Sequence, residues 1–263
     1  MTSTSHHFSI RQLKKPNSGR SIDCATWGWQ MAENWAAEMA ACGDIAAVKA
    51  VFVAAISQFG YSAAACGAFL PTARGPEPHF FFQHWPQAWI ELYRSRNFHL
   101  ADFSVAAARR RIAPFTWQDV KAQRKLSRAE QDLWDTALQW GWSDGLSVPF
   151  HGPGGYLGLV TMAGGRTLTA AERDSLHLLA FHTHERCRAL SGVAASPLPI
   201  APMTLRELEC LRWVVAGKTD AETATIMGLS RDTVKGYVDS ARAKLGAQTR
   251  PQAAAKLILA GLS

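Results

Sequence analysis

The chain has 263 residues, of which 48% are hydrophobic and 19% charged, so it can build one large or two ordinary domains and lacks a disordered composition. Its 28 lysines and arginines exceed its 21 acidic residues, and the net charge of +7 favours a polyanionic partner, nucleic acid before membrane. We find no transmembrane run, no signal-peptide core and no metal or disulfide pattern among the five cysteines, and therefore expect a cytoplasmic protein without metal or cofactor.

The first half of the chain begins with predicted helices and a predicted hairpin. Residues 1–20 show no periodic apolar pattern and are expected to form a mobile arm. Apolar residues recur at helical spacing over 24–59, with a break at Gly43, which predicts two helices. Two β-prone runs, 61–70 and 78–83, predict a hairpin with a loose loop.

The next segment contains two capping boxes with a second hairpin between them. One box starts a predicted helix over 127–141, and the other starts a longer helix over 169–190. The apolar runs 143–150 and 156–163 flank a glycine-rich turn and predict two paired strands. Residues 21–190 are therefore predicted to form an α/β/α sandwich around an antiparallel sheet.

A proline-rich linker and an all-α domain follow. Three prolines within 191–202 exclude a continuous helix there. Residues 203–263 are predicted to form four helices: Thr204–Ala216, Asp220–Met227, Arg231–Leu245 and Arg250–Ala260. The predicted fold class of the whole chain is α+β.

The second and third of these helices, joined by the short turn 228–230, have the spacing of a helix-turn-helix, whose second helix enters the DNA major groove. Four side chains are expected on its outer face, with chemistry able to contact bases or phosphates: Arg231, Lys235, Asp239 and Arg242. The charges alone are also compatible with a solvated face of a small bundle.

The C-terminal motifs resemble the DNA-binding domain of LuxR-type regulators. The matching residues are Thr204, Glu207, Leu211, Ala216-Gly217-Lys218-Thr219, Glu222, Leu229-Ser230, Thr233-Val234-Lys235 and Lys244-Leu245. The match departs at Gly236-Tyr237, where such domains often carry a His. Response regulators share this domain, but the N-terminal half lacks the acidic pair, the phosphoacceptor Asp and the Lys of a receiver domain.

The N-terminal half carries a second pattern, Trp89-x3-Tyr93-x8-Asp102-x14-Trp117, with Gly145 ahead of the second hairpin. From spacing alone, a core rich in aromatics with a surface Asp is the preferred interpretation. The complete pattern is similar to the acyl-homoserine-lactone-binding domain of LuxR-type quorum-sensing receptors, and this resemblance favours a ligand site instead.

The resemblance implies a site made of Trp85, Trp89, Tyr93, Asp102, Ser104, Trp117 and Thr161. In it Trp89 would donate its indole N–H to the lactone carbonyl, and Asp102 would accept the ligand amide N–H. Tyr93 and Thr161 would bond the acyl carbonyl, and Trp117 would form a wall for the lactone ring. A buried neutral ligand needs such pairing of its amide and carbonyls.

Two positions depart from the usual pattern of that family. Phe103 follows Asp102 where a Pro is usual, so we expect the backbone of Asp102 to be less restrained. Trp85, four residues before Trp89, replaces a more usual Tyr and is expected to bring a bulkier ring into the site.

The resemblance therefore implies a ligand-responsive transcriptional regulator of quorum sensing, not an enzyme. It would bind an N-acyl-homoserine lactone and, as a homodimer, an inverted-repeat DNA operator, with RNA polymerase a further candidate partner. The helices at 169–190 and 250–262 are candidate dimer contacts.

Two alternatives stay open at this point. The regulator could respond to a non-lactone molecule, for example a plant-derived one, or to none. The chain could also be an enzyme with an accessory DNA-binding module, although no GxSxG, HExxH or Walker motif is present.

Overall fold

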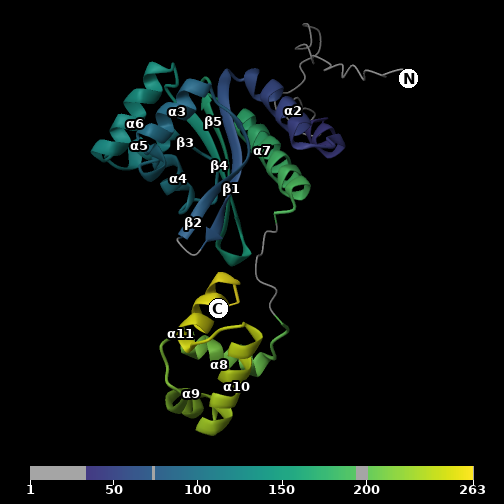
Figure 1. The fold of residues 1–263 in the computed structure, drawn as a ribbon, viewed down its shortest axis with the longest axis vertical. Helices are drawn as coiled ribbons and strands as arrows, with labels where there is room; N and C mark the ends of the chain where they lie inside the picture. Colours follow the sequence, from purple (N-terminus) through teal and green to yellow (C-terminus); the bar gives the residue numbers. More distant parts are fainter. Residues whose placement is uncertain (1–33, 73–74, 194–200, 263) are drawn as a thin grey trace.

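The computed structural model describes residues 34–72, 75–193 and 201–262 (Figure 1). The predicted arm at 1–20 and most of the predicted linker lie outside these residues. The described residues form an N-terminal α/β/α domain and a C-terminal all-α domain, which confirms the predicted fold class.

The sheet of the N-terminal domain has five antiparallel strands in the order β2-β1-β5-β4-β3. The strands are β1 Tyr61–Thr72, β2 Gly75–His84, β3 Phe115–Thr116, β4 Gly145–Gly152 and β5 Tyr156–Gly164. Both predicted hairpins are present. The first is longer than predicted, because β1 and β2 stay paired through the segment that was expected to be a loose loop, up to Thr72 opposite Gly75.

One face of the sheet is covered by α2, Ile45–Ser57, and α7, Ala170–Ser191, with a further helical segment at 34–41 (Figure 1). Asp44 caps α2 by accepting a hydrogen bond from the Ala47 amide at 2.8 Å, and the predicted capping box starts α7. These helices and the sheet bury the larger apolar core of the domain.

The other face is covered by short helices, and these position the candidate site. They are α3 Gln87–Ser95, the 3-10 turn η1 Phe98–Leu100, α4 Phe103–Ala108, α5 Trp117–Gln123 and α6 Arg128–Gln139. The sequence pattern predicted α6 but not α4 or α5, because helices of six and seven residues carry too few turns to show an apolar period. Both are stabilised at their start by side-chain caps, from Asp102 and Thr116.

The C-terminal domain contains α8 Leu205–Val215, α9 Asp220–Met227, α10 Arg231–Lys244 and α11 Arg250–Leu259, each within one residue of its predicted bounds. Thr204, Thr219 and Ser230 are the N-caps of α8, α9 and α10, and each accepts a hydrogen bond from a backbone amide of the first turn. Val234 and Val238 are buried on the inner face of α10.

The buried carboxylate of Glu207 connects two helices of this domain. Glu207, 5% exposed, accepts hydrogen bonds from Ser240 Oγ at 2.5 Å and from Lys244 Nζ at 2.7 Å. These partners hold the pKa of Glu207 at about 2, so the carboxylate is charged at neutral pH. The contacts join the start of α8 to the end of α10.

Within the described ranges, no helix is both long and apolar enough to cross a membrane. In the same part of the chain, no three His, Cys, Asp or Glu side chains are grouped as metal ligands.

Candidate functional site

A cavity of about 1310 Å³ lies between the sheet and the short helices of the N-terminal domain. Strands β1, β2 and β5 form one side, and α3 to α6 form the other. All the predicted ligand-site residues line it: Trp85, Trp89, Tyr93, Asp102, Ser104, Trp117 and Thr161. Residues up to 76 positions apart in the chain thus line the same cavity.

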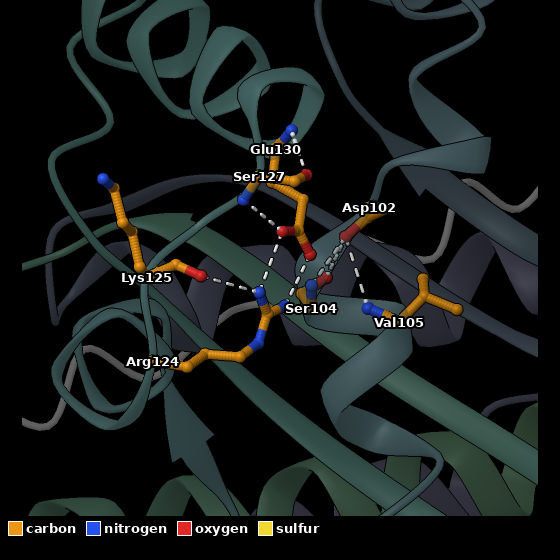
Figure 2. A network of polar contacts seen from close by, with 7 residues as sticks. All are labelled: Asp102, Ser104, Val105, Arg124, Lys125, Ser127 and Glu130. Atoms are coloured by element: carbon orange, nitrogen blue, oxygen red, sulfur yellow. Dashed lines mark hydrogen bonds and ion pairs between the residues drawn. The ribbon is translucent and has the colours of Figure 1, made fainter.

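Asp102 is the N-cap of α4, and its carboxylate is held in place by its neighbours (Figure 2). Oδ1 accepts hydrogen bonds from Ser104 N at 2.9 Å, Ser104 Oγ at 2.6 Å and Val105 N at 3.3 Å. Oδ2 accepts from Tyr93 Oη at 2.7 Å. A carboxylate with several fixed donors keeps one orientation, and Oδ2, which accepts only from Tyr93, has a second lone pair for a further donor.

Phe103, the residue that takes the place of the usual Pro, is 3% exposed and packs edge-on against Trp117, with the ring centroids 5.9 Å apart, and at a tilt against Trp134 at 5.8 Å. Packing of Phe103 anchors the first turn of α4, and the cap hydrogen bonds orient the Asp102 carboxylate. The weaker restraint of the Asp102 backbone expected from Phe103 stays a prediction.

The Tyr93 hydroxyl is neutral and donates a hydrogen bond to Asp102. Burial, reinforced by the charge of Asp102, raises the pKa of Tyr93 far above its usual range. A tyrosine hydroxyl has one proton, and in this structure that proton is donated to Asp102 Oδ2. For Tyr93 to donate to an acyl carbonyl, its O–H would have to turn away from the carboxylate.

Four tryptophans, two of which line the cavity, form one aromatic cluster. Trp85 stacks on Trp89 with centroids 6.1 Å apart, and Trp142 meets Trp89 edge-on at 4.7 Å. Trp140 stacks on Trp142 at 5.8 Å, and Trp142 Nε1 donates to Ser62 Oγ at 3.1 Å. Trp140 and Trp142 were not predicted as site residues, and the tryptophan content was the only sequence signal for them. Trp85 lies just before α3, because Pro86 is the N-cap of that helix.

Trp117 carries an unpaired donor into the cavity wall. Its side chain is 7% exposed, and its Nε1 has no hydrogen-bond partner among the residues that the structure describes. Gly145 makes this placement possible, since a Cβ atom there would lie 2.4 Å from Trp117 Cε2. A buried indole N–H without an acceptor is costly, so a ligand acceptor at this point would stabilise the domain.

Thr161 contributes a hydroxyl from the floor of the cavity. It lies on β5, where its Cα is paired with Ser147 of β4, and the two hydroxyl oxygens are 3.3 Å apart. Either hydroxyl can be the donor, so Thr161 keeps a proton or a lone pair for a third group.

The C-terminal domain presents the predicted DNA-reading helix as α10. Arg231 and Lys235 are exposed at its start. Further along, Arg242 and Asp239 form an ion pair at 3.2 Å, so these two polar groups partly satisfy each other. Arg231 also borders a hollow at the start of α9 that Lys218, Asp220 and Arg250 line. Arg250 is paired there with Asp220, and Lys218 with Glu222.

Comparison with known proteins identifies both domains. Residues 44–187 match the autoinducer binding domain, and residues 201–257 match the family of bacterial regulatory proteins called the luxR family. The chain is 31% identical over 216 residues to the HTH-type quorum sensing-dependent transcriptional regulator RpaR of Rhodopseudomonas palustris, covering 80% of this chain and 88% of RpaR.

Solved structures show the same fold. SdiA of Escherichia coli superposes with a TM-score of 0.59 at 21% identity, over 91% of this chain and 99% of SdiA. A structure of SdiA in complex with octanoyl-rac-glycerol gives a TM-score of 0.61 at 21% identity, over 93% of this chain and 98% of SdiA. With an autoinducer-binding domain followed by a luxR-type helix-turn-helix domain, the chain belongs to the LuxR family of quorum-sensing transcriptional regulators.

Proposed function

We propose that this regulator binds an N-acyl-homoserine lactone in the cavity between the sheet and helices α3 to α6. The observation that carries the proposal is the Asp102 carboxylate, fixed by four donors in the wall of an aromatic-lined cavity. A fixed carboxylate in a largely apolar cavity makes a strong, charge-assisted hydrogen bond with a ligand amide N–H.

The other polar groups of the cavity complete the recognition. Trp89 is proposed to donate to the lactone carbonyl and Thr161 to the acyl carbonyl. Tyr93 is proposed to bond the acyl carbonyl as well, by turning its O–H away from Asp102 Oδ2 when the ligand binds. Trp117 is proposed to form the wall for the lactone ring, as Gly145 lets its ring sit flush with β4. Ser104 acts by holding Asp102.

We further propose that the protein works in the cytoplasm as a homodimer on an inverted-repeat operator and has no catalytic activity of its own. Its reading helix, α10, carries Arg231 and Lys235 at the end that enters the groove in helix-turn-helix proteins. Apolar side chains are exposed on both proposed dimer helices, Phe181 on α7 and Ile258 on α11. The proposed domain bounds are 21–190 and 203–263, with the linker at 191–202.

A non-lactone ligand is the second candidate. SdiA, whose fold this chain shares, has been solved with octanoyl-rac-glycerol, an acyl ester without a lactone ring or an amide. Such a molecule offers one ester carbonyl as an acceptor, and hydroxyl groups instead of an amide N–H as donors to Asp102. The two ligand classes are therefore separated by direct binding of each and not by their dependence on Asp102 alone.

The test is equilibrium binding of a lactone panel and of octanoylglycerol to the full chain and to Asp102→Asn. Asparagine keeps an oxygen that can cap α4 but removes the charge, so lactone affinity is expected to fall at least tenfold. The gain in melting temperature on adding lactone should shrink accordingly.

Asp119→Asn is the matched control, because Asp119 is also a cap-region carboxylate, at the start of the neighbouring helix α5, and does not line the cavity. Its lactone affinity should equal that of the wild type. Equal lactone binding by Asp102→Asn and wild type would remove the site assignment. Binding of octanoylglycerol but of no lactone would make the non-lactone candidate correct.

A further inference from the structure

The turn that joins β4 to β5 touches the DNA-binding domain. This turn, η2 Pro153–Gly155, lies against α11 (Figure 1). A Cβ atom at Gly155 would lie 3.3 Å from Leu259 Cδ2, so the backbone of the turn is in close contact with this side chain near the end of α11. The two domains therefore meet at a point that belongs to neither the ligand cavity nor the reading helix.

The ligand domain holds the turn in place. β4 and β5 stay paired up to Gly152 opposite Tyr156, at the base of the turn. Tyr156 is 6% exposed, and its hydroxyl oxygen lies 3.0 Å from Nε2 of the buried His184 of α7. The same hairpin carries Thr161 in the cavity wall, roughly 20 Å from Gly155 at about 3.4 Å per strand residue. The turn is thus a fixed extension of the ligand-binding sheet.

The DNA-binding domain holds the other side of the contact, because α11 packs on α8 and α10. Leu257 is fully buried in the core that these three helices share. Lys256 Nζ donates to the carbonyl oxygens of Leu245 and Gly246, each at 2.8 Å, at the end of α10. A group that contacts Leu259 is therefore connected to the reading helix through a packed and hydrogen-bonded element.

The contact covers part of a surface that the proposed dimer also needs. Leu259 and its neighbour Ile258 remain 46% and 52% exposed beside the turn. Covering this apolar area with a second chain is favourable, but the turn and a second chain cannot both occupy Leu259. Because the turn belongs to the same chain, its local concentration at α11 is high, and a small contact is enough for it to compete.

We propose that the β4–β5 turn docks on the end of α11 within one chain and restrains the DNA-binding domain, so that α11 pairs with a second chain only after the turn has left Leu259. The inference rests on the proposed function, because it takes α11 as a dimer helix and Thr161 as a ligand contact. One hairpin then carries both a ligand-binding side chain and the turn that restrains the DNA-binding domain.

The test places a side chain into the contact from the ligand domain. Gly155→Asn suits this purpose, because Gly155 has a φ of 75°, which asparagine tolerates, and the new side chain would crowd Leu259. Small-angle X-ray scattering of the full chain, diluted until it is monomeric, is expected to give a larger radius of gyration for the variant than for the wild type. Affinity for a labelled inverted repeat should rise about three- to tenfold, since fewer chains are held in the restrained form.

Gly141→Asn is the matched control. Gly141 belongs to the same domain and has a φ of 79°, and a Cβ atom there would meet no neighbouring group of the described residues within 4 Å. This control should keep the radius of gyration and the DNA affinity of the wild type. Leu259→Ser weakens the contact from the other side and should also expand the chain. It is measured by scattering alone, because Leu259 lies on the proposed dimer helix.

The inference is overturned, while the proposed function stands, if Gly155→Asn and Leu259→Ser are both as compact as the wild type. It is also overturned if Gly155→Asn expands the chain without tightening DNA binding. A wild type that is dimeric at every dilution would overturn it too, because the turn would then not compete with pairing. If the wild type neither dimerises nor binds an inverted repeat, with or without lactone, the proposed function itself fails.

Discussion

At the scale of single residues, one side chain of the candidate site both stabilises a helix and is proposed to bind the ligand. Asp102 caps α4 and is also the proposed acceptor for the ligand amide. The orientation of its carboxylate is set by Ser104 and Val105 in the first turn of α4 and by Tyr93, so the ligand meets a carboxylate that needs little rearrangement. Such preorganisation improves affinity because less conformational entropy is lost on binding.

Trp85 is expected to set the preference for the acyl group. The volume of about 1310 Å³ exceeds the roughly 300–1,000 Å³ of ordinary ligand pockets, so total space does not limit the acyl chain. The limit is local, because the Trp85 ring is held in the wall by Trp89 and Trp142. We expect the wild type to prefer short, branched or aryl acyl groups over chains of about ten or more carbons.

Trp85→Ala should shift this preference toward longer chains, measured as ligand dose-response in a reporter assay. Trp140→Ala is the control, because Trp140 belongs to the same aromatic cluster but does not line the cavity. A best response of the wild type to a long-chain lactone, with no shift in Trp85→Ala, would show that the steric argument is wrong.

At the scale of elements, α7 packs on the sheet through a buried imidazole. His184 is fully buried, and its Nε2 lies 3.0 Å from Tyr156 Oη. Gly158 allows this approach, because a Cβ atom there would lie 2.1 Å from His184 Nε2. The ring also stacks on Phe150, with the centroids 4.6 Å apart. A polar ring thus fills the space between helix and sheet on the side opposite the cavity.

The stability of this domain is expected to fall as the pH drops from 6.5 to 4. Burial lowers the pKa of His184 to about 4 from its ordinary value of 6.5. In that interval the unfolded chain binds a proton that the folded chain does not, so the free energy of unfolding decreases, by roughly 3 kcal/mol at pH 4.

The measurement is denaturant unfolding followed by tryptophan fluorescence at several pH values. His184→Gln retains a polar partner for Tyr156 and should flatten the pH dependence over this interval. His182→Gln, two positions away and partly exposed, should leave it unchanged. An identical slope in His184→Gln and wild type would mean that other groups cause the loss of stability.

At the scale of the whole molecule, a ligand domain and a DNA domain are joined by one chain, and their sites share no residues. Substitutions on α10 are therefore expected to affect DNA binding without affecting the ligand. The buried Glu207 keeps α10 fixed on α8, so a change at an exposed position of α10 leaves the domain folded.

Lys235→Ala and Arg242→Ala should weaken binding to an inverted repeat whose half-sites are about one helical turn apart. If Lys235 contacts phosphate, its loss should also reduce the slope of log affinity against log salt by about 1. Lys125→Ala, an exposed lysine of the ligand domain, is the control. Fluorescence anisotropy with labelled DNA measures both quantities, and a footprint of one half-site bound by a single chain would contradict the dimer.

Most elements could be predicted from local sequence signals. Capping boxes marked the starts of α6, α7, α8 and α9, and the two apolar runs around the glycine-rich turn marked β4 and β5. These signals work because a cap or a tight turn is made by residues within four positions of one another. The resemblance to the ligand-binding domain of LuxR-type receptors then predicted seven residues that line the cavity.

Long-range packing determines contacts that no local sequence pattern predicts. The pairing of Tyr93 with Asp102, the Trp142 contact with Ser62 and the burial of Glu207 against α10 depend on segments that meet only after the chain has folded. Hydrogen bonding and burial act through space, so the orientation and ionisation of these groups are properties of the tertiary structure.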